Sequence, residues 1–176
     1  MHKEYDITID WRGFELHPEI PAGGMEAGEY FPPDRLKLMN EYMVSFALTF
    51  GVDISFTSHL PSTRRALAMA EFAREHGALD KFRELAMLAY WRDGEDLEDE
   101  DVLRTIAGNS GLGAEAALAA STDKQYLARI DTVRAESESI GVTGIPTMII
   151  GTQRIVGCQP YAEIATACER AGARKR

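Results

Sequence analysis

The stretch that decides the fold is GVTGIPTMIIGTQRIVGCQP, residues 141–160. Glycines and Pro146 precede the apolar run TMII, and a proline is tolerated at the first position of a strand because only one ladder donor is lost. We therefore expect a loop that leads into a strand over 147–150. A turn at residues 151–153 and a second strand over 154–156 should complete a hairpin.

The spacing of apolar residues predicts that most of the remaining chain is helical. YDITIDW alternates apolar and polar residues and predicts a strand over 5–11. Apolar residues spaced three and four apart predict a helix over 34–50, with Gly51 just after its end. Thr122 and Gln125 fit a capping box at the start of a later helix. The other expected helices cover, in order, 62–76, 79–91, 99–107, 113–120, 123–140 and 160–171.

This order of elements predicts an α/β fold with helices inserted in its middle. We divide the chain into three segments on this basis. Residues 1–61 hold a strand, a loop and a helix, residues 62–140 form an inserted all-helical subdomain, and residues 141–176 hold the loop, the hairpin and the last helix.

Charge and composition limit the classes of partner. Lys and Arg total 19 against 28 Asp and Glu, so the net charge is -9, which argues against nucleic acid and anionic membranes as partners. The sequence has no apolar run of about 20 residues and no secretory signal at its start. Two cysteines are too few for a disulfide framework. We expect a cytoplasmic protein.

The loop before the hairpin is the candidate binding site. If the Ile145-Pro146 bond is cis, the loop turns sharply and leaves the backbone groups of residue 145 unpaired at the surface. These groups could hold an extended peptide or a thiol substrate by strand-like hydrogen bonds. The alternative is a trans proline that only begins a strand, which is the commoner case. The candidate substrate-binding residues are Thr143, Gly144, Ile145, Pro146 and Thr147.

Several segments, taken in order, resemble the DsbA-like thioredoxin-fold oxidoreductases, particularly their cytoplasmic FrnE-like branch. These are residues 141–160, IDWRGFELHPEIP at 9–21, LPSTRRALAMAEFAREHG at 60–77 and LDKFRELAMLAYWRDGEDLEDEDVL at 79–103. The resemblance covers essentially the whole chain. It implies a thioredoxin-like fold interrupted by the helical subdomain, a cis Ile145-Pro146 bond, and thiol–disulfide exchange with protein or small-molecule thiols through a mixed disulfide.

The sequence departs from that family at its start. The family opens with a strand and a helix that begins with C-x-x-C, and this sequence contains no C-x-x-C. Cys158 and Cys168 lie about 15 Å apart if most of the intervening residues are helical, whereas a disulfide needs less than about 7 Å between Cα atoms. We expect Cys168 to be a core residue and Cys158 to be a possible free thiol. The resemblance therefore implies that the first βα unit is missing from this sequence, no catalytic residue is assigned, and the chain as given is expected to be redox-inactive.

Three explanations of this departure stay open: a truncated or mis-started oxidoreductase, a stable redox-inactive relative, or a new function. The resemblance also allows a glutathione-dependent isomerase or transferase of the 2-hydroxychromene-2-carboxylate isomerase (kappa-class) type. A third hypothesis is a non-enzymatic module that binds a partner or forms a homodimer through an open sheet edge. We expect no cofactor, with glutathione possible as a substrate, and no metal, because the four histidines lack ligand spacing.

Overall fold

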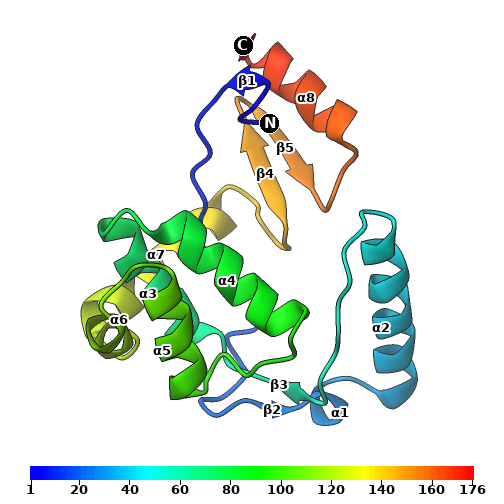
Figure 1. The fold of residues 1–176 in the computed structure, drawn as a ribbon. Coiled ribbons are helices and arrows are strands. Elements are labelled where there is room, and N and C mark those ends of the chain that lie inside the picture. Colours follow the sequence, from blue (N-terminus) through cyan, green and yellow to red (C-terminus); the bar gives the residue numbers. More distant parts are fainter. The chain divides into compact units, whose positions relative to one another are not determined.

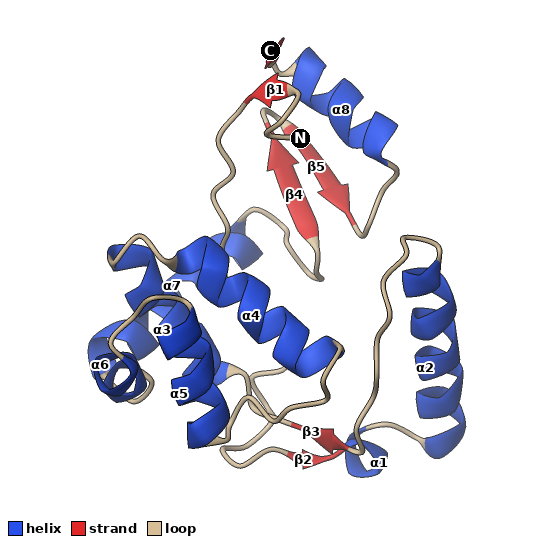
Figure 2. Cartoon of the chain, in the orientation of Figure 1, coloured by secondary structure: helices blue, strands red, loops and turns tan.

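The computed structural model describes residues 1–176, in which helices outnumber strands and every strand is short (Figures 1 and 2). The elements in order are β1 (Tyr5–Asp6), β2 (Met25–Glu26), α1 (Ala27–Tyr30), α2 (Pro33–Leu48), β3 (His59–Leu60), α3 (Arg64–Glu75), α4 (Leu79–Trp91), α5 (Glu100–Asn109), α6 (Ala114–Ala120), α7 (Lys124–Ser139), β4 (Thr147–Ile150), β5 (Gln153–Val156), α8 (Tyr161–Arg170) and β6 (Arg174–Lys175). None of these helices combines the length and the apolar character needed to span a bilayer.

The chain forms two compact units. One contains Met1–Leu16 with Val133–Arg176, and the other contains His17–Thr132. Helix α7 begins in the second unit and ends in the first. The predicted division at residues 61 and 140 follows chain order, and it stays a prediction beside this division by contacts.

The unit of His17–Thr132 has a helical core. Its buried residues come mainly from α3, α4, α5 and α6, which lie together in Figure 1. Met69, Phe82 and Leu103 are the large apolar side chains removed most completely from solvent. Helix α5 begins where the Asp99 carboxylate accepts hydrogen bonds from the amides of Asp101 and Val102, at 2.7 and 3.1 Å. This is the usual way in which an acidic N-cap satisfies the open amides of a first turn.

The same unit holds three elements that the sequence analysis did not predict, namely β2, α1 and β3. β2 pairs with β3 in an antiparallel ladder in which Met25 faces Leu60. Gly24 lies against this ladder with φ +73°, and a Cβ at that position would collide with the His59 ring and the Leu60 carbonyl. A glycine is needed here both for the backbone conformation and for the close approach.

The unit of Met1–Leu16 and Val133–Arg176 contains two separate ladders. β4 and β5 form an antiparallel hairpin with Ile149 opposite Arg154. β1 pairs instead with β6, so the two ends of the chain lie together, with Tyr5 opposite Lys175. The Tyr5 hydroxyl also donates to Glu169 of α8 at 2.6 Å, and this contact ties α8 to the β1–β6 ladder.

Two local expectations need correction. The predicted strand over 5–11 is wrong beyond Asp6, because only Tyr5 and Asp6 find a partner strand, and a strand forms only where its backbone groups are paired. The predicted capping box is also wrong. The Asp123 carboxylate accepts from the Gln125 amide at 2.7 Å, while the Thr122 hydroxyl donates back to Ala119. The strand over 147–150 is confirmed, and its partner begins one residue earlier than predicted.

Candidate functional site

The end of α7 delivers the chain into the loop of residues 141–146. The Gly141 amide donates to the Glu138 carbonyl and the Val142 amide donates to the Ser137 carbonyl, both at 2.9 Å. With Gly141 at φ +77°, this is a Schellman motif, in which a glycine in the left-handed region closes the last turn of a helix. Val142 is buried. The loop therefore starts from a fixed point.

Arg154 on β5 also binds the backbone where α7 leads into the loop. Its Nη1 donates to the carbonyl oxygens of Ile140 and Gly141, at 3.2 and 2.6 Å. A Cβ on Gly141 would collide with this guanidinium group. Sequence reasoning missed Arg154, because the only local sign was a basic residue in the second strand of a hairpin.

Two hydrogen bonds close the turn of the loop. The Thr147 hydroxyl donates to the Gly144 carbonyl at 2.6 Å. The Gly157 amide, one residue beyond β5, donates to the Pro146 carbonyl at 2.8 Å. The Ile145-Pro146 peptide bond between these two contacts is cis. The side chain of Thr147 and the backbone after β5 together hold the loop on the hairpin.

The tip of the loop faces solvent. Thr143, Ile145 and Pro146 are exposed, and the Ile145 residue is 52% accessible. Gly144 and Thr147 are half-buried. The backbone hydrogen bonds of the region leave the amide and the carbonyl of Ile145 unused. The structure thus brings the five predicted binding residues together in one turn, at which one residue offers its backbone donor and acceptor to the outside.

The exposed face of the hairpin that carries the loop holds two aliphatic side chains beside Arg154. β4 and β5 pair only with each other among the strands of the structure. Ile149 on β4 and Val156 on β5 are each about half accessible, at 50% and 55%. Unpaired strand edges with aliphatic side chains are the surfaces that add a further strand.

The two cysteines lie in different surroundings. Both are free thiols, Cys158 exposed and Cys168 buried on α8. The prediction that Cys168 is a core residue is confirmed. Cys158 directly follows Gly157, whose amide donates to the Pro146 carbonyl. Cys158 is therefore next in sequence to a residue that holds the loop on the hairpin.

A hydrogen-bonded ionisable pair of this unit, Tyr5 and Glu169, lies at the β1–β6 ladder. The hydrogen bond from Tyr5 holds the pKa of the Glu169 carboxyl below its ordinary value of 4.5, and the same bond raises the pKa of the Tyr5 hydroxyl above its ordinary value. A carboxylate that accepts a hydrogen bond is stabilised in its charged form. This pair connects α8 to the ladder, and neither residue is among the five of the loop.

Comparison with known proteins agrees with this architecture. A family model described as the DSBA-like thioredoxin domain matches residues 1–169. The uncharacterized YwbO protein of Bacillus subtilis (strain 168) is 26% identical over 158 residues, which cover 88% of this chain and 78% of that protein. The crystal structure of a probable DsbA oxidoreductase from Streptomyces coelicolor matches with a TM-score of 0.79 over 91% of this chain and 73% of its own, at 20% identity. The last match supports the fold alone.

Proposed function

The chain belongs to the DSBA-like thioredoxin domain family, and from this premise we propose that it binds a thiol- or disulfide-containing molecule, the substrate class of thiol–disulfide exchange, at residues 143–147. The substrate class is an extended peptide or a small molecule that carries the sulfur. The match of the family model over residues 1–169 supports this proposal, and the fold shared with a probable DsbA oxidoreductase is consistent with it.

The observation that carries the binding role is the free backbone of Ile145. Its amide and carbonyl are unused within the chain, and its residue is 52% accessible. An extended peptide that passes this residue can accept from the amide and donate to the carbonyl, as an added strand does. Each such bond contributes about 0.5–1.5 kcal/mol. The contacts of Arg154 and Thr147 hold the turn in place, so little ordering cost opposes binding.

We propose in addition that residues 1–176 bind without dithiol turnover. Exchange requires a thiolate that attacks one sulfur of a disulfide and a second thiol that resolves the mixed disulfide. The only cysteines are Cys158 and Cys168, they do not form a C-x-x-C, and Cys168 is buried. Their free thiols favour a reducing compartment, and we propose the cytoplasm.

Peptide binding tests the site directly. A labelled peptide that contains one S-methylated cysteine should bind the full chain, as measured by fluorescence anisotropy. Ile145→Pro removes the amide donor and should weaken binding about two- to ten-fold, the value of one hydrogen bond. Ile145→Val keeps the donor and is the matched control. Equal affinity of the two variants would contradict the proposed backbone contact.

Insulin reduction by dithiothreitol tests the redox statement. We expect a rate no higher than the rate without protein. Turnover comparable to that of a DsbA-like protein with a C-x-x-C would refute it.

Calorimetric titration with glutathione tests the isomerase or transferase alternative. A measurable heat of glutathione binding, together with no binding of the peptide, would favour that class of enzyme.

The exposed edges of the β4–β5 hairpin favour a second candidate, a binding module that adds a strand or a second copy. The half-accessible Ile149 and Val156 are the observation behind it. Sedimentation equilibrium should then show self-association that Ile149→Lys abolishes, since a charge on an edge strand opposes pairing. A monomer at all concentrations would exclude the homodimer.

A further inference from the structure

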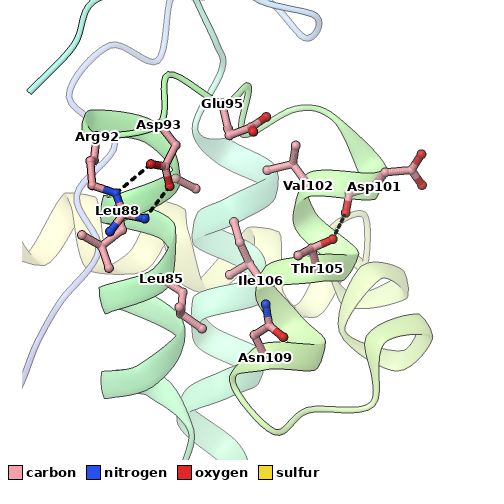
Figure 3. A pocket seen from close by; sticks show the side chains of 11 residues that line it. Leu85, Leu88, Arg92, Asp93, Glu95, Asp101, Val102, Thr105, Ile106 and Asn109 are labelled. Carbon is pink, nitrogen blue, oxygen red and sulfur yellow. Dashed lines mark hydrogen bonds and ion pairs between the residues drawn. The ribbon is translucent and has the colours of Figure 1, made fainter.

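A groove runs between α4 and α5 in the helical unit, and none of the residues that line it is assigned to the loop. Its volume is about 410 Å³, within the range of about 300–1,000 Å³ that is usual for ligand pockets. Figure 3 shows Leu85 of α4 and Ile106 of α5 on facing sides of it. The floor is apolar and consists of Leu85, Leu88, Ala89, Val102 and Ile106.

The rim of this groove is acidic. The lining contains three acidic residues, Asp93, Glu95 and Asp101, and one basic residue, Arg92. That arginine is already neutralised, because its Nε and Nη2 each donate to an oxygen of Asp93 at 2.7 Å. Figure 3 shows this pair at one end of the groove.

The two other rim carboxylates differ in their pairing. Asp101 accepts from Arg104 at 2.8 Å, whereas the exposed Glu95 carboxylate is unpaired. The rim therefore presents uncompensated negative charge beside an apolar floor. This combination rejects anionic ligands and favours an apolar group that has a cation next to it.

We propose that the α4–α5 groove binds an amphipathic, basic segment of a partner polypeptide. Leucine-like side chains of this segment fill the space over Leu88 and Ile106, and a lysine or arginine pairs with Glu95. A hydrophobic groove can bind the apolar face of an amphipathic helix, which anchors through residues at i, i+3 and i+4. The groove lies within one compact unit and its occupant does not depend on the function proposed for the loop.

The test uses the full chain and a short labelled peptide of leucine, lysine and alanine with leucines at i, i+3 and i+4. Binding is measured by anisotropy, and its location by protection of α4 and α5 from hydrogen exchange. Glu95→Lys should weaken affinity about five-fold. Leu88→Ala should weaken it about ten-fold through lost apolar contact. Leu88 is only half-buried, and circular dichroism confirms that this variant is folded.

The matched control is Asp80→Lys, which makes the same charge change on α4 outside the groove. The proposal holds if α4 and α5 are protected and the two groove variants weaken binding more than this control. It is overturned if Asp80→Lys weakens binding as much as Glu95→Lys, because that result means general attraction to an acidic protein. Equal binding of a peptide with glutamate in place of lysine, or the absence of protection at α4 and α5, also overturns it.

Discussion

Replacing Arg154 with methionine should loosen the entry to the loop. The guanidinium donates to the Ile140 and Gly141 carbonyls at 3.2 and 2.6 Å, and methionine keeps most of the aliphatic length without a donor. Both bonds are at the surface, where each contributes at the low end of the usual range, about 0.5 kcal/mol. The sum is about 1 kcal/mol, which corresponds to an increase of about five-fold in the population of the open loop.

Hydrogen exchange of single amides measures that population. The Val142 amide donates to the Ser137 carbonyl at 2.9 Å, so it exchanges only when the end of α7 opens. We expect about five-fold faster exchange at Val142 in Arg154→Met and an intermediate rate in Arg154→Lys, which can restore one bond.

A second amide and a second variant make this experiment decisive. The Ala78 amide, which donates to Ala73 in the other compact unit, should exchange at its original rate. Arg170→Met makes the same chemical change at an exposed arginine of α8 and should leave Val142 unaffected. Unchanged exchange at Val142 in Arg154→Met, or an equal effect of Arg170→Met, would show that the Arg154 contacts do not hold the loop.

Three other changes have definite expected outcomes. Phe82→Ala should lower the free energy of unfolding in urea by about 3–5 kcal/mol, because Phe82 is 1% exposed in the helical core, whereas Met87→Ala, at 52% exposure, should cost less than about 1 kcal/mol. Asp99→Ala removes the cap of α5 and should cost about 1 kcal/mol in the same assay, while Asp99→Asn keeps an acceptor and should cost less. The pKa of Glu169 is lowered by its bond from Tyr5, so its stabilisation is complete above about pH 4.5 and is lost as the pH falls through the lower folded value. The protection of the β6 amides, measured relative to their intrinsic exchange rates at each pH, should therefore fall on acidification, and Glu169→Gln should remove that dependence.

Local signals in the sequence were sufficient for most helices and for the hairpin. The helix over 79–91 was predicted, and α4 spans Leu79–Trp91. Apolar spacing identifies the buried face, and Gly77 and Gly94, both at positive φ, mark the positions where helices stop. The loop before β4 was also located from the sequence, because Gly144 and Pro146 punctuate the chain before an apolar strand, and the binding role of its five residues stays a prediction.

Pairing between distant segments could not be predicted in this way. YDITIDW has the alternation of a strand along its whole length, yet only Tyr5 and Asp6 pair, and their partner is at the other end of the chain. Alternation reports which side chains share a face, but it does not say which backbone will supply the opposite hydrogen bonds.

The sequence by itself determined the kind of each long helix, the β4–β5 hairpin, the family and the absence of a C-x-x-C. Only the tertiary structure decided that Arg154 anchors the loop, that the Ile145 backbone is left free, and that α4 and α5 enclose an apolar groove with an acidic rim. The physical reason is the separation along the sequence over which each kind of interaction acts. Helix periodicity and glycine conformations are set within a few residues, whereas these contacts join side chains and backbones whose proximity exists only after the chain has folded.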